Sequence, residues 1–265
     1  MTTTDRRGAL CAGAGLVAGG ALAAGCSTAT DTTAQPTPAH TSPNAPSHTP
    51  AGATPLAAPA PRAFPRQPGQ ITHGPRDRPR VALTFHGQGD PALAGKLLDE
   101  AERHGAHITV LAVGSWLDEH PEIARRILDG GHDLGNHTQR HIAVNALSES
   151  GARAEITECA DRLRRLTGSI GTWFRPSRAP TASPLVTRLA RAAGYPHVLS
   201  YDVDSLDYTR PGAPAVTRKI LAEVRGGSVV SLHFGYPDTV AALPAVLQEL
   251  DRRGLRAVTT TELLS

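Results

Sequence analysis

Residues 80–104 contain the pattern that decides the fold: an apolar strand, a polar turn and then an amphipathic helix. The strand Arg80–Phe85 reads Arg-Val-Ala-Leu-Thr-Phe, the turn reads His86-Gly87-Gln88-Gly89-Asp90, and the helix spans Pro91–His104. Proline at the first helical position is typical of a helix start. The segment therefore predicts one βα unit with polar groups at the carboxyl end of its strand.

The same alternation continues to the end of the chain, and glycines such as Gly105 and Gly168 follow several predicted helices, as a C′ position prefers. Repeated βα units with apolar strands predict a parallel sheet covered by helices. Seven units are one short of a complete eight-stranded barrel, so we predict an α/β fold, an irregular (β/α)7-type barrel. The predicted strands are Arg80–Phe85, His107–Val113, His132–Asn136, Thr172–Arg175, His197–Val203, Ser228–His233 and Arg256–Thr260, and the main helices are Pro91–His104, Pro121–Asp129, Glu149–Leu166, Pro184–Ala193, Pro214–Val224 and Thr239–Arg253.

Residues 1–26 have the features of an export signal. Arg6-Arg7 precede a short apolar run, which ends in Leu22-Ala23-Ala24-Gly25-Cys26. A basic start, a short apolar core and small residues before the cut are typical of a secretory signal. The end resembles a bacterial lipobox, so we expect a lipid anchor at Cys26 and a secreted protein on the outer face of the cytoplasmic membrane. A plain signal peptide with an incidental cysteine is the alternative.

Residues 27–79 are rich in Thr, Ala, Ser and Pro, which predicts an extended tether without a core of its own. The remaining residues, 80–265, are enough for one domain. Its single cysteine, Cys159, cannot form an internal disulfide and is expected to be a small buried residue. A net charge of +3 with 4% aromatic residues gives no nucleic-acid signature. We expect a monomer that binds no nucleic acid.

Two histidines four residues apart lie at the end of the third predicted strand, in the run Asn136-His137-Thr138-Gln139-Arg140-His141. Two neutral imidazoles on one face make half of a zinc-type site. The Glu that follows the first His in metalloprotease helices is absent, which disfavours that class. Two surface histidines in a polar turn are the alternative, and a metal site needs a third ligand from elsewhere.

Five predicted strand ends carry charged or imidazole groups that a hydrophobic core would not tolerate. In parallel barrels the chemistry lies where strands end and βα loops begin, so we expect these groups to converge on one rim. They are the segments His86–Asp90, Asn136–His141, Arg175–Arg178, Asp202–Asp207 and the single residue His233.

These segments, in this order, resemble the NodB-type polysaccharide deacetylases, carbohydrate esterases that remove acetyl groups from cell-wall glycans. The resemblance covers residues 80–264. It is carried by Val81–Phe85, Gly135–His141, Phe174-Arg175-Pro176, Val203–Tyr208 and Ser231-Leu232-His233. It implies a NodB-homology-like barrel, a divalent metal such as zinc and an acetylated polysaccharide substrate.

The resemblance also implies roles for individual residues. His137 and His141 match the two metal-binding histidines, and Arg175 matches the arginine that orients the general base. Asp207 matches the aspartate that pairs with the catalytic histidine, and His233 matches that histidine, the general acid.

Three further residues are expected at the substrate. Arg178 stands where the family has a tyrosine whose backbone N–H contributes to the oxyanion hole, which puts a long cation in the cleft. Leu232 is expected to line the acetyl pocket. Tyr201 is expected either in the core or in a wall of the sugar cleft.

The first motif departs from the family, which has Thr-Phe-Asp-Asp-Gly with one Asp as base and the next as third metal ligand. Here His86 and Gly87 occupy these positions. Two repairs are chemically reasonable. In the first, which we favour, His86 is the base and Asp90 is the third ligand, because the intervening glycines allow a tight return. In the second, His86, His137 and His141 form a His₃ site and Asp90 is the base.

The sequence thus predicts a metal-dependent hydrolase that removes acetyl groups from an envelope polysaccharide such as peptidoglycan or a chitin-like glycan. Gly87 keeps open a second function, a degenerate member of the same fold that binds glycan without turnover. A deacylase of another small amide or ester is the third.

Overall fold

The computed structural model of the protein describes residues 58–265. The expected signal peptide and residues 27–57 of the expected tether lie outside this range. Within it, no helix is long and apolar enough to cross a membrane. The strands are β1 (Gln70–Ile71), β2 (Arg80–Gly87), β3 (Thr109–Ala112), β4 (Asp133–Asn136), β5 (Val198–Leu199), β6 (Val203–Asp204), β7 (Val229–His233) and β8 (Arg256–Ala257), and the α-helices are α1 (Pro91–Arg103), α2 (Gly114–Glu119), α3 (Glu122–Asp129), α4 (Glu149–Thr167), α5 (Pro184–Ala192), α6 (Ala213–Glu223), α7 (Pro237–Arg252) and α8 (Thr260–Leu264).

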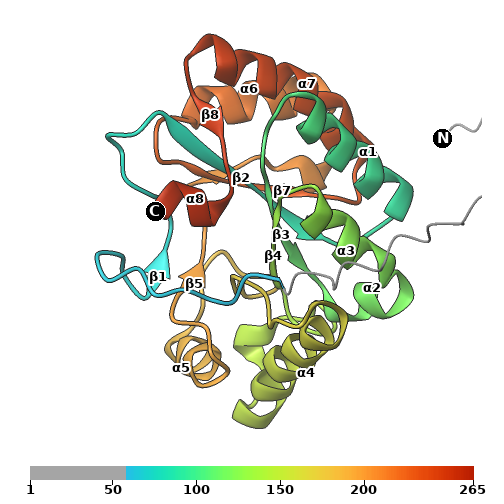
Figure 1. The fold of residues 1–265 in the computed structure, drawn as a ribbon, viewed down its shortest axis with the longest axis vertical. Helices are drawn as coiled ribbons and strands as arrows, with labels where there is room; N and C mark the ends of the chain where they lie inside the picture. The colour runs from blue at the N-terminus through green and yellow to red at the C-terminus, as the bar shows by residue number, and fades with distance from the viewer. Residues whose placement is uncertain (1–57) are drawn as a thin grey trace, which may run out of the picture. The chain divides into compact units, whose positions relative to one another are not determined.

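The strands form a parallel wall in the order β4-β3-β2-β7-β6, and β8 pairs with the start of β2. A smaller parallel sheet pairs β1 with β5. Phe174 bridges to Asn136 in β4 and to Val198 in β5, so the two sheets are continuous. Helices α1 to α7 lie on the outside of this curved wall (Figure 1), whereas α8 packs against the inner cluster with Leu263 and Leu264. The predicted irregular (β/α) barrel is therefore confirmed.

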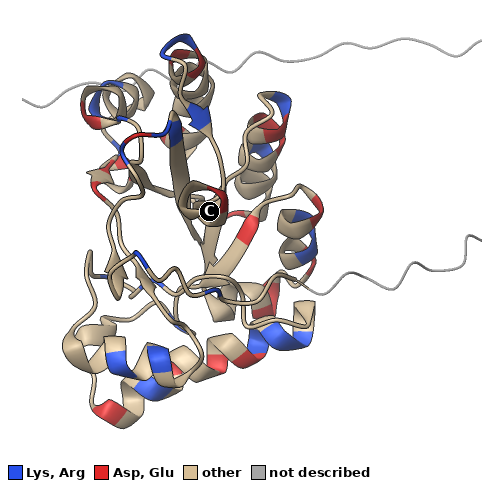
Figure 2. Ribbon diagram, turned by 60° about the vertical axis from the view of Figure 1, so that its left-hand side comes forward, with Lys and Arg blue, Asp and Glu red and all other residues tan. Residues whose placement is uncertain are grey.

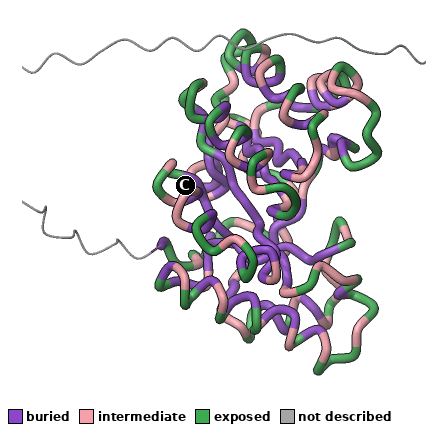
Figure 3. The backbone as a smooth tube through the Cα atoms, turned by 90° about the vertical axis from the view of Figure 1, so that its right-hand side faces the viewer, coloured by how far each residue is buried: buried purple, intermediate pink, exposed green. Residues whose placement is uncertain are grey.

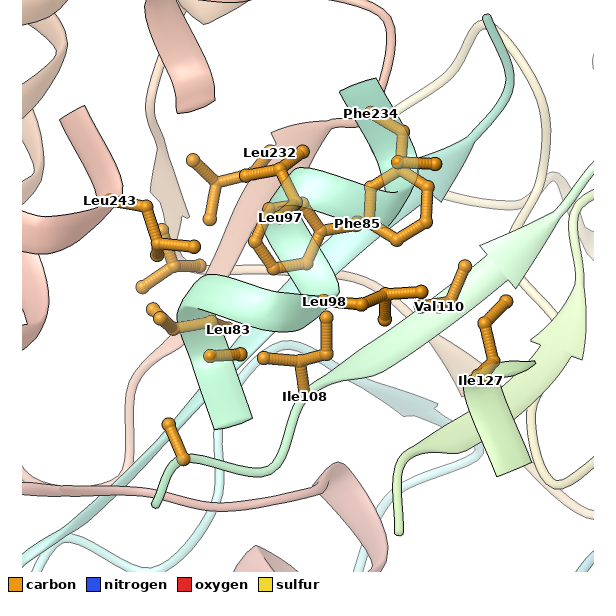
Figure 4. Close-up of a cluster of buried hydrophobic side chains, with 14 of the residues drawn as sticks. Leu83, Phe85, Leu97, Leu98, Ile108, Val110, Ile127, Leu232, Phe234 and Leu243 are labelled. Atoms are coloured by element: carbon orange, nitrogen blue, oxygen red, sulfur yellow. The ribbon is translucent and has the colours of Figure 1, made fainter. Parts of the chain in front are cut away.

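Strand β2 runs through the centre of the wall, and its alternating side chains separate two hydrophobic clusters. Leu83 and Phe85 pack outward against helices α1 and α7, in the cluster drawn in Figure 4. Ala82 packs inward with Leu111 and Trp173. Because alternate side chains of a strand face opposite sides, His86 shares the inner face with Ala82.

The polar exterior is carried by the helices. In Figure 2 the charged residues lie mostly on the helices, while the strands are largely uncharged. In Figure 3 the buried backbone runs through the sheet, and exposed backbone marks the outer helices and loops. This burial pattern is what an amphipathic helix around an apolar parallel sheet requires.

Residues 58–79 belong to the fold, which corrects the expected boundary at residue 79. Phe64 is buried and stacks on Trp173, with ring centroids 5.6 Å apart. Its backbone N–H donates to Nε2 of His197 over 2.9 Å. Ile71 in β1 is fully buried. Two apolar anchors in a proline-rich segment are therefore enough to hold it on the barrel, and an aromatic pair contributes about 0.5–1.5 kcal/mol beyond its buried area.

The predicted strand His197–Val203 is two separate strands, β5 and β6, which pair in different sheets. Strand β3 is shorter than the predicted His107–Val113, and two other predicted strands are shorter still. The segment 172–175 contributes only the bridge at Phe174, and the segment 256–260 forms only the two residues of β8. Helix α8 follows it, opened by a capping box between Thr259 and Glu262. That Thr-x-x-Glu spacing is a helix-start signal that the sequence reasoning overlooked.

Candidate metal centre and active site

A cleft of about 520 Å³ opens at the carboxyl ends of the strands, where the polar strand ends were expected to converge. Residues from five of these segments line it, so the convergence on one rim is present in the structure. The lining residues are His86, His141, Arg178, Ala179, Pro180, Tyr201, Asp204, Tyr208, Ser231, His233 and Tyr236.

His86 stands at the floor of this cleft, next to two other imidazoles. Its ring centroid is 4.4 Å from that of His137 and 4.3 Å from that of His233. Its Nε2 atom is 3.2 Å from the hydroxyl of Ser231. The inward alternation of β2 thus brings His86 to the centre of the candidate site.

The loop that carries His137 and His141 is held in an unusual backbone conformation. Thr138 and His141 have φ angles of 70° and 55°, which few residues other than glycine adopt. The side chain of the buried Glu155 accepts hydrogen bonds from the backbone N–H and the Nε of Arg140 over 2.8 and 2.6 Å. Helix α4 therefore pins this loop, and backbone strain of this kind often accompanies functional sites.

The hydrogen bonding of His137 leaves one ring nitrogen available for a ligand. Its Nδ1 is 3.0 Å from the carbonyl oxygen of Arg175 and donates to it, which leaves the lone pair on Nε2. That Nε2 atom is buried and has no hydrogen-bond partner within residues 58–265. A buried polar atom without a partner calls for an explanation, and an ion is one of the standard ones.

Together the three imidazoles form the one group of three or more His, Cys, Asp and Glu residues, within residues 58–265, that is arranged to hold a metal ion. One ligand atom from each of His86, His137 and His141 lies within 4.8 Å of the others. Three neutral imidazoles with an open fourth position are a donor set that catalytic zinc sites use. The donor set and the unpartnered Nε2 therefore fit a divalent metal.

The surroundings keep these histidines neutral. Burial holds the pKa of His86 and of His137 well below the usual value, and neighbouring imidazoles add to the effect. Burial, followed by the cation of Arg178, lowers the pKa of His141 to about 4. Neutral imidazole is the form that binds a metal.

Beside His86, on the neighbouring strand β7, His233 forms a hydrogen-bonded dyad with Asp207. Oδ1 of the fully buried Asp207 is 2.7 Å from Nδ1 of His233. Oδ2 accepts from the backbone N–H of His233 over 2.8 Å and from the hydroxyl of Thr239 over 2.6 Å. The carboxylate thereby fixes Nδ1 as the protonated nitrogen and leaves Nε2 of His233 free to exchange a proton.

Arg175 lies fully buried behind the three histidines. Its guanidinium donates to the hydroxyl of Thr84 over 2.8 Å and to two backbone carbonyls, and it sits 5.4 Å from the centre of the Tyr201 ring. One terminal nitrogen has no partner within the described residues. Burial lowers the pKa of Arg175 to about 10, so it remains a cation at neutral pH.

Two of the three expected substrate residues lie at the cleft. Arg178 is exposed there with φ = 53°, and its Nε donates to the carbonyl oxygen of His141 over 3.0 Å. Tyr201 forms part of a cleft wall. Burial raises the pKa of its phenol, and the carboxylate of Asp204 adds to the effect.

Leu232 lies elsewhere, which corrects its expected place at the acetyl pocket. It is buried among core residues on the outer face of β7, with Leu97 and Leu243 (Figure 4). Ser231 and His233 point into the cleft, so alternation along β7 directs the side chain between them to the opposite face. Ser231 therefore occupies the place expected for Leu232.

Asp90 and Gly87 do not contribute to the histidine group. The exposed Asp90 is the N-cap of α1, and its carboxylate accepts from the backbone N–H of Ala92 over 2.8 Å. The expectation that Asp90 is the third ligand is therefore corrected, because its side chain is turned to the helix. A Cβ added at Gly87 would lie 2.9 Å from Cγ1 of Val110 and 3.1 Å from Cα of Ala112. The side chain of Val110 and the backbone of β3 thus crowd any side chain at position 87.

Sequence reasoning missed several residues of the cleft. Ser231 and Asp204 lie on inward positions of β7 and β6, and the strand alternation alone would have found them. Tyr208 and Tyr236 stand on either side of His233, with ring centroids 5.5 and 5.7 Å from its ring. Nothing in the local sequence signals the tyrosines, because loop geometry brings them together.

Comparisons with known proteins identify the family of this chain. The family model described as polysaccharide deacetylase matches residues 73–198. A peptidoglycan-N-acetylglucosamine deacetylase of Bacillus cereus is 30% identical over 194 residues, which are 72% of this chain and 90% of that protein. A chitooligosaccharide deacetylase of Sinorhizobium fredii is 30% identical over 191 residues, 66% of this chain and 87% of that protein.

Solved structures share the fold. That of a CE4 family pseudoenzyme from Bacillus anthracis superposes with a TM-score of 0.71 at 23% identity, over 75% of this chain and 70% of that one. Fold and sequence thus define a carbohydrate esterase of the NodB type. The chain belongs to the polysaccharide deacetylase family, hydrolases that act on the amide bonds of acetylated polysaccharides.

Proposed function

We propose that this domain is a zinc-dependent deacetylase that removes N-acetyl groups from amino sugars of a cell-envelope glycan, peptidoglycan or a chitin-like polymer. One observation carries the proposal: three metal-ready imidazoles share a cleft with a carboxylate–histidine dyad. The two relatives are named for deacetylation of peptidoglycan and of chitooligosaccharide, which supports this substrate class.

In this proposal His86, His137 and His141 hold the metal, and His86 is a ligand and not the base. The ligand set of the second repair is favoured because the three ligand atoms lie within 4.8 Å of one another. Asp90, the base in that repair, caps helix α1 instead, so the base of the second repair is not retained. Zinc suits three neutral imidazoles. When bound, such a cation polarises the acetyl carbonyl and makes water more acidic.

The remaining chemistry belongs to side chains on the dyad side of the cleft. Asp207 holds Nδ1 of His233, so Nε2 gives a proton to the leaving amine as the C–N bond breaks. The backbone N–H of Arg178 serves the developing oxyanion. The rings of Tyr201, Tyr208 and Tyr236 offer flat apolar walls to a sugar ring.

A second function is favoured by one specific observation. No carboxylate belongs to the metal-ready group within residues 58–265, and Gly87 has no room for one. A domain that binds metal and glycan without turnover is therefore the alternative.

Acetate release and metal content together separate the two functions. The purified full chain is loaded with zinc, its metal is counted by elemental analysis, and acetate is measured after incubation with N-acetylated chitooligosaccharides and with peptidoglycan. We expect about one zinc per chain and acetate from at least one glycan. Zinc without acetate, together with glycan binding, would establish the alternative. Acetate from small esters alone would assign the site to another deacylase.

We also propose that the protein is a monomer anchored by a lipid at Cys26 to the outer face of the cytoplasmic membrane. The proposal rests on the lipobox-like Leu22-Ala23-Ala24-Gly25-Cys26. Replacement of Cys26 by Ser should move the protein from the membrane fraction to the soluble fraction. A protein that stays soluble with Cys26 intact would contradict the anchor.

A further inference from the structure

The proposed metal set leaves the reaction without an evident proton acceptor. A hydrolase of this kind needs a group that takes the proton of the attacking water. His86 stands where the family has its base, but its ring belongs to the metal-ready group. Asp207 already accepts three hydrogen bonds, two from His233 and one from Thr239.

Asp204 is the one carboxylate among the residues that line the cleft. It ends strand β6 in register with Ser231 of β7, which is in turn in register with Thr84 of β2. Residues in register on parallel strands point to the same face, and the strands lie about 4.8 Å apart. The Asp204 carboxylate therefore starts beside the Ser231 hydroxyl, which is 3.2 Å from Nε2 of His86.

The hydrogen bonding of Asp204 leaves one oxygen free. Oδ1 accepts from the backbone N–H of Leu206 over 3.1 Å, which fixes the orientation of the carboxylate. Oδ2 makes no hydrogen bond within residues 58–265, and the side chain is only partly buried. A fixed carboxylate with a free oxygen at the cleft surface is what a proton acceptor requires.

The buried cation of Arg175 also supports a role for the Asp204 carboxylate. Its guanidinium is fully buried, forms no salt bridge within the described residues and keeps one nitrogen unpartnered. Asp204 is the one carboxylate whose charge acts appreciably on it. The cation that matches the base-orienting arginine of the family is thus within electrostatic reach of a carboxylate on β6.

We propose that Asp204 is the proton acceptor of this site, so that the carboxylate lost from β2 is replaced by one on β6. This assignment rests on the proposed deacetylase function. The water oxygen bonds to the acetyl carbon while its proton passes to Oδ2 of Asp204. The C–N bond then breaks as His233 protonates the amine. Acetic acid leaves and gives its remaining proton to the solvent, while Asp204 releases its proton and His233 regains one through the solvent.

Asp202, two residues earlier, provides a matched control. Its carboxylate accepts from the backbone N–H of Val229 over 2.8 Å and pairs with Arg76 over 2.8 Å, and it does not line the cleft. Replacement of Asp202 by Asn should lower stability while the kcat of the folded enzyme stays unchanged.

The test compares zinc-loaded full-length Asp204→Asn, Asp204→Ala and Asp202→Asn with the wild type. We expect Asp204→Asn to lower kcat by about 10²–10⁴-fold, with zinc content and KM unchanged. Added formate, a small carboxylate, should restore part of the activity of Asp204→Ala. A purely structural residue would not be rescued in this way.

Three outcomes would overturn the assignment. Wild-type kcat in Asp204→Asn would show that the proton goes elsewhere, and loss of zinc from that variant would make Asp204 a ligand. In both cases the proposed function stands, because the wild type remains active. A zinc-loaded wild type that releases no acetate would overturn both proposals together.

Discussion

The two sides of the cleft differ in how completely their polar groups are bonded. On the β7 side, both oxygens of Asp207 are hydrogen-bonded, and Nδ1 of His233 is fixed by one of them. On the β2 side, Nε2 of His137 has no partner among residues 58–265, and within that range the His86 ring has only the Ser231 hydroxyl. Saturated groups are arranged to hold and pass a proton, whereas buried nitrogens without partners await a ligand. The comparison therefore divides proton transfer and metal binding between the two sides.

The largest effect is expected on the metal side, from His86→Ala. Removal of one of three ligands should reduce zinc to well below one per chain and abolish acetate release, because a metal contributes several kcal/mol to transition-state stabilisation. Elemental analysis after dialysis and the acetate assay measure both effects. The matched control is Asp90→Ala, which should keep zinc and lose only its helix cap, about 0.5–2 kcal/mol of stability. Zinc loss in Asp90→Ala with zinc retained in His86→Ala would reverse the assignment of the third ligand.

The next effect is expected on the proton side, from His233→Ala. Loss of a general acid should lower kcat by about 10²–10⁴-fold, while zinc content remains that of the wild type. Asp207→Asn should act in the same direction, because the amide cannot hold Nδ1 of His233 as a carboxylate does. If either variant also loses zinc, the two sides of the cleft are not independent.

The sequence predicted the proton side better than the metal side, and the reason is physical. Asp207 and His233 each match one position of a motif, and two hydrogen bonds join them. The prediction of the third metal ligand depended instead on whether the side chain of His86 or that of Asp90 points to His137 and His141. The inward alternation of β2 directs His86 to the histidines, while Asp90 begins a helix and caps it.

The other differences between the predictions and the structure have two causes. Some signals in the sequence were not used, and some contacts leave no signal in the sequence. Leu232 was expected at the cleft although it alternates with His233 and must face the core. Phe64 and Ile71 were hidden by the average composition of a proline-rich segment. The convergence of the strand ends on one rim and the order of the main helices, in contrast, followed from the βα periodicity, although α2 and α8 were not predicted.

The variant Gly87→Asp restores the aspartate that the family has at this position, and it tests whether the metal side of the cleft can still accept a carboxylate. Gly87→Asp should destabilise the protein by about 3 kcal/mol, the upper end for overpacking, since its Cβ would meet the backbone of β3 at Ala112. Urea unfolding measures the change. Gly95→Ala in α1, where nothing lies within 4 Å of the added Cβ, should instead stabilise by about 0.5–1 kcal/mol. A stable Gly87→Asp protein with higher activity would mean that position 87 can still hold the metal-binding aspartate of the family.

The smallest effect is expected at Thr239, whose hydroxyl bonds to the dyad. Its hydroxyl donates to Oδ2 of Asp207 over 2.6 Å from the first turn of α7, and it is fully buried. Thr239→Val keeps the shape and removes this bond, so Asp207 should hold His233 less firmly. We expect kcat to fall about tenfold, equivalent to about 1.4 kcal/mol, with KM and zinc content unchanged.

Two further variants distinguish positioning from packing at Thr239. Thr239→Ser keeps the hydroxyl and should restore most of the lost kcat. Thr217→Val removes a hydroxyl that bonds only within α6, to the carbonyl of Ala213, and should leave kcat unchanged. If Thr239→Val lowers stability and leaves kcat intact, the hydroxyl supports the fold alone. If zinc is lost as well, the Thr239–Asp207 hydrogen bond also affects metal binding, and the proton side and the metal side of the cleft are not independent.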